Sequence, residues 1–267
     1  MRSCWGKSLS VIAVVCCFLT LPLYGGSNKD NIGKTDFSRQ FQKRWGNKPI
    51  KIRQVNYSNQ VRGTFPGSST VERCAERFYK TLDYLPESLI RKSRLKYVTF
   101  LRDLKLNNQA ASGVASGDTI FLHVDFTVGT VFHEFFHVFD PIRKNEKWCK
   151  LNDKSFVYSG NQFYSVNMSR KKKKQVKRNN RKSNIEESFV SEYAMSFEWE
   201  DRAETFAYMI VEGRNFLKRT KNPIIKAKME YIMTLFIQRG LLDEAFWEKH
   251  FDRKFKAKNR FYSNEKQ

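Results

Sequence analysis

Two of the four histidines in this chain lie four residues apart, in the run His133-Glu134-Phe135-Phe136-His137. Residues i and i+4 share one face of a helix, so both imidazoles could bind the same metal ion. A glutamate directly after the first histidine would lie beside that metal, where its carboxylate could accept a proton from bound water. The pattern therefore indicates a hydrolytic zinc site. The alternative is a pair of buried, hydrogen-bonded histidines without a metal, although this would also bury a carboxylate that has no task.

A catalytic zinc site needs a third protein ligand and an open position for water. One common arrangement places glycine and histidine three and six residues after the second histidine, but Asp140 and Arg143 occupy those positions. A carboxylate from a later helix is the other common solution, and Glu200 and Glu204 lie one turn apart on such a helix. Spacing alone does not choose between them, and a solvated acidic turn is the alternative.

The run at residues 133–140, together with Tyr193 and residues 200–207, resembles the gluzincin metallopeptidases. The similarity is greatest to the branch that holds the anthrax lethal factor catalytic domain, the bacterial Pro-Pro endopeptidases and zinc-binding metallopeptidases of bacterial lipoproteins. In that branch a tyrosine lies seven residues before the glutamate ligand and a second glutamate four residues after it, and Tyr193, Glu200 and Glu204 match this spacing.

The resemblance implies a zinc endopeptidase that carries one Zn²⁺ per chain and hydrolyses a protein or peptide substrate. Bound zinc would lower the pKa of its water towards about 7, so that the water could attack a peptide carbonyl. The roles that the resemblance implies are zinc ligands at His133, His137 and Glu200, a general base at Glu134, a transition-state donor at Tyr193 and a hydrogen-bond partner of a ligand histidine at Glu204.

The chain departs from the pattern of that branch in two places. Phe136 stands before the second histidine, where related sequences often have glycine, and the connection between the two motifs is enlarged by a basic block. Neither departure removes a ligand. The resemblance covers residues 133–207, and the first hundred residues carry no motif that points to a function.

The helices that must position these residues can be predicted from capping and apolar spacing. The first is expected to run from Asp125 or Thr127 to Asp140 and to carry both histidines. The second is expected over residues 196–212 and carries both candidate glutamates. A proline can open a third helix at Pro223, whose apolar residues recur at helical spacing.

The upstream half is expected to supply a small sheet. Apolar residues at helical spacing predict a helix over residues 70–82, and β-branched and aromatic runs predict strands at 97–101 and 119–124. Residues 110–118 between the strands are small and polar, which is typical of a loop. Strands followed mostly by helices indicate an α+β fold. The resemblance specifies it as a zincin-like domain with a small mixed or antiparallel sheet, an active-site helix and a mainly helical C-terminal half.

In the family that the motif resembles, the strand before the active-site helix lies along the cleft. The backbone of that strand could pair with an extended substrate, which gives a possible substrate strand at Ile120, Phe121, Leu122 and His123. The side chain of His123 is expected to face solvent rather than the cleft.

Residues 1–26 have the pattern of a secretory signal, with two basic residues, no acid, an apolar stretch and small residues at its end. We therefore expect an exported protein, periplasmic, extracellular or membrane-attached, in which residues 27–267 form a single zinc metallopeptidase domain. An uncleaved N-terminal membrane anchor is the alternative. Attachment as a lipoprotein through Cys16 or Cys17 is disfavoured, because Val15 stands where such signals usually carry a small residue.

Export would place the remaining cysteines, Cys74 and Cys149, in an oxidising compartment, where they could form a disulfide. Two unpaired thiols are the alternative.

The formal net charge is +22, from 49 basic and 27 acidic residues, which predicts attraction to anionic surfaces. An aromatic content of 15% excludes an intrinsically disordered chain. From Arg170 to Lys182 nine of thirteen residues are basic and none is acidic, which is typical of a solvated loop. A basic tail follows Asp252. These segments could bind an anionic surface, including membrane head groups, which is compatible with peptidase activity.

The same charge supports a competing class, a non-catalytic exported protein that binds anions or cell surfaces and holds a structural metal. Structural zinc usually has four protein ligands, whereas the sequence offers three candidates. The basic block contains no aromatic residue, which makes nucleic acid an unfavoured partner.

Overall fold

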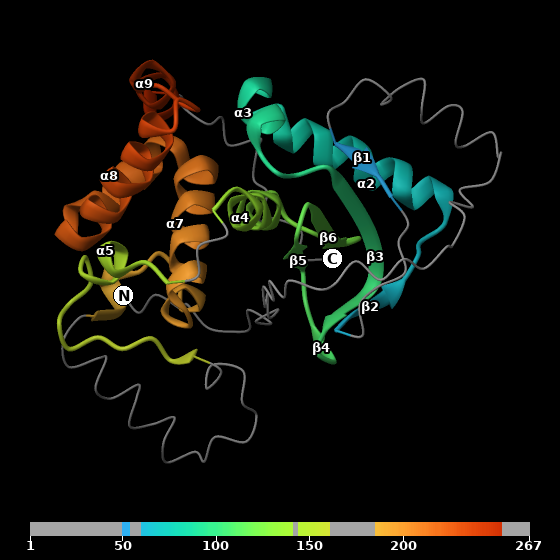
Figure 1. Cartoon of the computed structure of the whole chain (residues 1–267), viewed down its shortest axis with the longest axis horizontal. Helices are drawn as coiled ribbons and strands as arrows, with labels where there is room; N and C mark the ends of the chain where they lie inside the picture. Colours follow the sequence, from blue (N-terminus) through green and yellow to red (C-terminus); the bar gives the residue numbers. More distant parts are fainter. Residues whose placement is uncertain (1–49, 54–59, 141–143, 161–184, 253–267) are drawn as a thin grey trace, which may run out of the picture.

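The computed structural model describes residues 50–53, 60–140, 144–160 and 185–252 (Figure 1). Four sequence predictions lie outside these residues: the signal region at 1–26, the lipid attachment at Cys16 or Cys17, the basic block at 170–182 and the tail after Asp252. In the described ranges, no helix has both the length and the apolar character needed to cross a bilayer.

A small mixed sheet forms the first half of the described fold, with strand order β1-β3-β6-β5. Strand β3 runs parallel to β1 and β6, whereas β5 is antiparallel to β6. Two further strands, β2 and β4, pair antiparallel with the second half of β3. The strand bounds are β1 Lys51–Ile52, β2 Val61–Thr64, β3 Tyr97–Leu106, β4 Gln109–Ala110, β5 Gly113–Ser116 and β6 Thr119–His123.

The prediction that residues 110–118 form a loop is wrong for most of that stretch. Gly113–Ser116 is strand β5, which pairs with β6 in a register that runs from Gly113 opposite Leu122 to Ser116 opposite Thr119. Small residues have weak intrinsic strand preference, and pairing with the buried neighbour decides the conformation here. The turn to β6 contains Gly117, whose φ of +61° suits a residue without a side chain.

Helices form the rest of the fold and surround a central one, α4 (Figure 1). Helix α4 contacts α7 on one side, strands β5 and β6 on another, and α2 on a third. The α-helices are α2 Ser68–Leu82, α3 Glu87–Lys92, α4 Val128–Phe139, α5 Glu146–Cys149, α7 Glu198–Glu212, α8 Pro223–Gln238 and α9 Glu244–Asp252. The described residues also include the 3₁₀ segments η2 Ile185–Ser188, η3 Tyr193–Met195 and η4 Gly213–Lys221. The architecture confirms the predicted α+β class.

Helix α4 begins at a reciprocal cap, because the side chains of Thr127 and Thr130 each accept a hydrogen bond from the other residue's backbone N–H. This satisfies two amide donors that a helix start leaves without partners. The helix ends at Phe139, with Asp140 as its C-cap. The predicted helix therefore forms with nearly the expected bounds.

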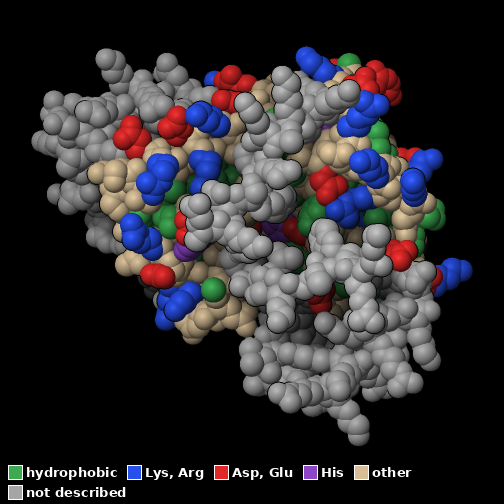
Figure 2. All heavy atoms as spheres, turned by 180° about the vertical axis from the view of Figure 1, so that it is seen from behind, with side chains coloured by type: hydrophobic (Ala, Val, Ile, Leu, Met, Phe, Trp, Pro, Cys, Tyr) green, Lys and Arg blue, Asp and Glu red, His purple; other side chains and the backbone are tan. Residues whose placement is uncertain are grey.

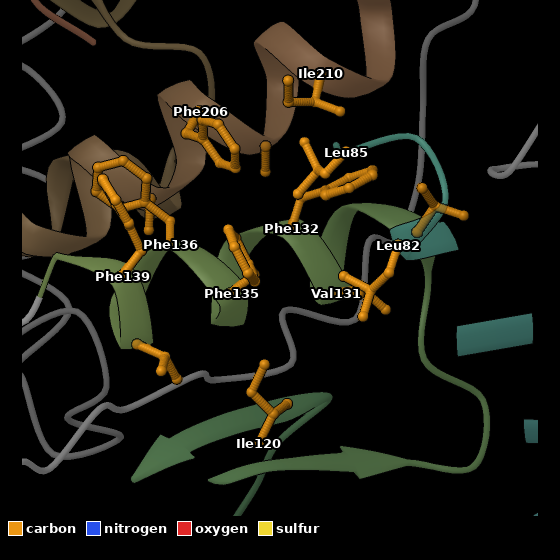
Figure 3. Packing of buried hydrophobic residues seen from close by; sticks show 14 of the residues in the cluster. Leu82, Leu85, Ile120, Val131, Phe132, Phe135, Phe136, Phe139, Phe206 and Ile210 are labelled. Atoms are coloured by element: carbon orange, nitrogen blue, oxygen red, sulfur yellow. The ribbon is translucent and has the colours of Figure 1, made fainter. Parts of the chain in front are cut away.

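Core residues of α7, of the sheet and of the end of α2 pack against α4 (Figure 3). Val131 of α4 lies near Leu82 at the end of α2, Ile120 of β6 lies below the helix, and Phe136 points towards Phe206 of α7. The ring centroids of Phe136 and Phe206 are 5.2 Å apart. The side chain at position 136 thus fills the space between α4 and α7, which a glycine there would leave open.

The predicted disulfide between Cys74 and Cys149 is wrong, because both thiols are free. The Sγ of Cys74 in α2 lies 3.5 Å from the carbonyl oxygen of Val124, whereas the Sγ of Cys149 in α5 lies 3.1 Å from Oε2 of Glu198. Helices α2 and α5 are on opposite sides of α4 (Figure 1), so no local movement could join the two sulfurs.

Candidate metal centre

Three side chains from α4 and α7 converge on one buried point. Nε2 of His133 lies 2.9 Å from Nε2 of His137, and Oε2 of Glu200 lies 2.9 Å from the first nitrogen and 3.1 Å from the second. The three residues are only 3%, 1% and 1% exposed, respectively. Within the described residues they form a group whose ligand atoms could hold one metal ion.

The donor set suits zinc, which binds imidazole nitrogen and carboxylate oxygen in tetrahedral sites. Ligand atoms at about 2.0–2.1 Å from a tetrahedral zinc ion lie about 3.3 Å from one another. The observed separations of 2.9–3.1 Å are a few tenths shorter, so small outward rotations of the side chains would admit the ion. Three protein ligands would leave one position open for water or substrate.

The pKa values of these groups are shifted by burial and by their close approach to one another. Burial alone would raise the pKa of Glu200, but the adjacent His137 and hydrogen bonds from both imidazoles lower it to about 2. Burial alone would lower the pKa of His133, but hydrogen bonds with Glu200 and Glu204 raise it well above its usual value. Burial lowers the pKa of His137. The ionised, buried carboxylate can be balanced either by a proton on an imidazole or by a divalent cation.

The structure distinguishes the two glutamates that spacing alone could not separate. Glu200 meets Nε2 of both histidines, whereas Oε1 of Glu204 lies 2.8 Å from Nδ1 of His133. An N–H at Nδ1 that donates to Glu204 leaves the lone pair of Nε2 directed at the cluster. Glu204 therefore selects the tautomer of His133 that a metal ion requires.

Ser191, which sequence reasoning missed, connects Glu204 to the segment that carries Tyr193. Its hydroxyl donates to Oε2 of Glu204 at 2.5 Å and accepts from the backbone N–H of Ala194 at 3.1 Å. The ring centroid of Tyr193 lies 5.8 Å from that of His133. The 3₁₀ turn η3 thus places the tyrosine next to the cluster, as the resemblance to the gluzincin branch implies.

Glu134 lies in the core with no exposed surface, pressed against β5. A Cβ atom built on Gly113 would stand 2.7 Å from Cγ and 2.8 Å from Oε1 of Glu134. Only glycine at position 113 leaves room for this carboxylate. A glycine inside a strand often marks such a close approach, but the surrounding stretch was interpreted as a loop.

Buried ionic contacts tie α7 to its neighbours α4 and α8, so that Glu200 meets α4. Arg202 lies between Glu198, at 2.9 Å from Nη1 to Oε1, and Asp140 at the end of α4, at 3.4 Å from Nε to Oδ2. On the other side, Nζ of Lys228 in α8 lies 2.8 Å from Oδ2 of Asp201. The two residues that follow Glu200, Asp201 and Arg202, are thereby tied to α8 and to the end of α4.

The prediction that Ile120, Phe121, Leu122 and His123 pair with substrate is wrong. Strand β6 lies between β3 and β5, and the backbone hydrogen bonds of both its edges are used by those neighbours. In the described part of the sheet, β5 has a neighbour on one side only, so it is the edge strand next to α4.

His123 itself is the last residue of β6. Its Nδ1 accepts a hydrogen bond from the backbone N–H of Asp125 at 3.2 Å, and its side chain is 29% exposed. It is not among the described residues that could hold the metal.

The fold and this centre define a zinc-binding metallopeptidase, and comparison with known proteins gives the same class. The family model described as "Putative zinc-binding metallo-peptidase" matches residues 103–257, more than half of the chain. The chain belongs to this family. No curated protein matches it.

A solved structure is also similar, that of "a putative zinc-binding metallo-peptidase from Bacteroides caccae ATCC 43185". The TM-score is 0.50 at 16% sequence identity, and the alignment covers 85% of this chain and 92% of that one. At this identity the similarity supports the fold alone.

Proposed function

We propose that this protein is an exported zinc endopeptidase of the gluzincin type, related to the branch that includes the anthrax lethal factor catalytic domain. The observation that carries the proposal is the convergence of His133, His137 and Glu200 on one buried point, with Glu134 on the same helix beside them. Export rests on the signal pattern of residues 1–26 alone.

In this proposal the three converging side chains hold the metal, and Glu134 moves the proton. Zinc bound there would polarise the scissile carbonyl and lower the pKa of a water molecule. The carboxylate of Glu134 accepts a proton from the water and passes it to the leaving amine. The contact with Gly113 limits the directions in which this carboxylate can turn, which keeps it oriented for the transfer.

Tyr193 is proposed to donate a hydrogen bond from its phenol to the oxygen on which negative charge develops. Donors placed where charge appears contribute most in a site that excludes water, and the adjacent imidazole of His133 is buried. The link through Ser191 and Glu204 fixes the distance between this tyrosine and the cluster.

The substrate is proposed to be an extended peptide that pairs with the outer edge of β5. A strand edge without a neighbouring strand offers backbone donors and acceptors to any sequence, which suits the binding of a chain that continues on both sides of the cleaved bond. Support comes from the place of β5 at the end of the strand order and from its contact with Glu134 through Gly113.

A non-catalytic anion-binding protein is supported less well. Structural zinc is usually closed by four protein ligands, whereas the group found among the described residues has three. Figure 2 shows that, on the face it presents, Lys and Arg side chains are interspersed with Asp and Glu side chains. Among the described residues of that face, this mixture is not the continuous basic stripe that a polyanion would follow.

The proposal is tested by metal analysis and cleavage of a peptide library by the purified chain. We expect bound zinc, cleavage at internal peptide bonds, loss of cleavage when a chelator removes the metal, and recovery when zinc is returned. A protein that binds zinc tightly but cleaves no peptide or protein in the library would favour the structural-metal alternative.

A further inference from the structure

The two carboxylate oxygens of Glu200 have different partners. Oε2 faces Nε2 of both histidines at 2.9 and 3.1 Å, whereas Oε1 accepts a hydrogen bond from the indole N–H of Trp199 at 3.0 Å. The indole comes from the preceding residue of α7. The cluster therefore has one oxygen directed at it, and the other is held by Trp199.

The indole is itself held in place. The ring of Trp199 stacks on that of Phe197, with centroids 4.4 Å apart and an angle of 17° between the planes. Phe197 is the N-cap residue of α7 and has an extended backbone, so its ring lies at the start of the helix. Stacked aromatic pairs of this kind stabilise one orientation of both rings.

An indole N–H is suited to this position for a chemical reason. It donates a hydrogen bond but has no lone pair with which to bind a metal ion, so it can engage a carboxylate oxygen without becoming a ligand. A carboxylate can bind a metal through one oxygen or through both. If both oxygens of Glu200 bound the ion, the second would occupy the position that a catalytic site leaves open.

We infer that Trp199 is a positioning residue, which holds Oε1 of Glu200 away from the metal so that the glutamate contributes a single ligand atom. This inference rests on the proposed function, because it assumes that Glu200 binds a metal ion. It adds a determinant of the coordination number that neither the histidine motif nor the spacing of the glutamates predicts.

The next residue of α7 provides a matched control. Trp148 donates its indole N–H to Oδ2 of Asp201 at 2.9 Å, and that carboxylate faces Lys228 rather than the histidines. Two neighbouring carboxylates of α7 thus each accept an indole hydrogen bond, and the bond to Glu200 reaches the metal centre whereas the bond to Asp201 does not. Removing the two hydrogen bonds in separate variants therefore distinguishes an effect on metal coordination, expected for Trp199 only, from a loss of packing, expected for both.

The test replaces zinc with Co²⁺ and records its visible absorption in the wild type, Trp199→Phe and Trp148→Phe. Four-coordinate Co²⁺ absorbs more strongly than five- or six-coordinate Co²⁺. We expect Trp199→Phe to retain its full complement of cobalt while the absorption intensity falls, because Glu200 can then bind through both oxygens. Trp148→Phe is expected to lower the melting temperature and to leave the cobalt spectrum as in the wild type.

Two results would overturn the inference. One is a cobalt spectrum of Trp199→Phe identical to that of the wild type, and the other is the same spectral change in Trp148→Phe. If Trp148→Phe does not fold, Tyr158→Phe removes another donor to Asp201 Oδ2 and replaces it as the control. A wild-type protein that binds neither zinc nor cobalt would instead overturn the proposed function, so the two failures can be distinguished.

Discussion

Gly113 of β5 and Glu134 of α4 fit together so closely that a Cβ atom on the glycine would lie 2.7 Å from the Cγ of the glutamate. The contact joins the edge of the sheet to the helix that carries both histidines. It explains how the Glu134 carboxylate can be buried between α4 and β5, because any side chain at position 113 would occupy the same space.

Gly113→Ala should therefore impair turnover without emptying the metal site. The new methyl group would push the Glu134 carboxylate out of its orientation, and displacement of a catalytic group by about 1 Å can cost about 10²-fold in rate. The measurement is kcat on a cleaved peptide together with zinc content. Gly67→Ala is the control, because no atom of the described residues, apart from the chain neighbours, lies within 4 Å of a Cβ atom at that position. Equal kcat in the two variants would show that the contact has no catalytic consequence.

Glu200→Ala and Glu204→Ala should differ in zinc affinity. Removal of a partner that only orients a ligand typically costs about 10–100-fold in metal affinity, and loss of a direct ligand should cost more. We expect Glu200→Ala to be free of metal at nanomolar zinc, whereas Glu204→Ala binds with weakened affinity. Chelator competition measures both dissociation constants, and the reverse order would mean that the roles are exchanged.

Lys228→Met should destabilise the fold strongly. Lys228 and Asp201 are 1% and 0% exposed, and removal of one partner of a buried ion pair typically costs about 3–5 kcal/mol of unfolding free energy. Lys226→Met is the control, because Lys226 pairs with Glu230 on the surface, where both side chains are more than half exposed. Urea unfolding measures the free energy of unfolding of both variants. If the two variants lost the same stability, the buried pair would not be what anchors α7.

Zinc binding should release a proton at neutral pH. The hydrogen bonds with Glu200 and Glu204 raise the pKa of His133 well above its usual value, so the metal-free protein keeps this proton at pH 7. A ligand imidazole must be neutral, and binding should release about one proton per chain. As the pH falls below that raised pKa, the apparent zinc affinity should decrease about tenfold per pH unit. Calorimetry in two buffers of different ionisation enthalpy measures the number of protons released. Release of no proton would contradict the assignment of His133 as a zinc ligand.

Local sequence signals predicted the parts of the fold that depend on neighbours in the chain. Thr127 caps α4 and Pro223 opens α8, because capping depends on residues within one turn. The spacing of His133 and His137 predicted that both imidazoles lie on one helical face, because helical periodicity also depends only on residues close in sequence.

The features that sequence reasoning missed arise between segments far apart in the chain. Strand β5 was interpreted as a loop, because its small residues form a strand only through pairing with β6. Ser191 contacts Glu204, and Lys228 contacts Asp201, across separate segments of the chain. No local sequence pattern at Ser191 or Lys228 indicates these partners. The prediction of a disulfide failed because compartment and cysteine number say nothing about the distance between two helices.

The most direct test of the central claim compares the wild type with Glu134→Gln on one peptide library, with zinc content measured on the same preparations. Glutamine has nearly the same shape but cannot accept the proton, so the variant should bind as much zinc as the wild type and cleave none of the peptides that the wild type cleaves. Cleavage by Glu134→Gln at the wild-type rate would contradict the account.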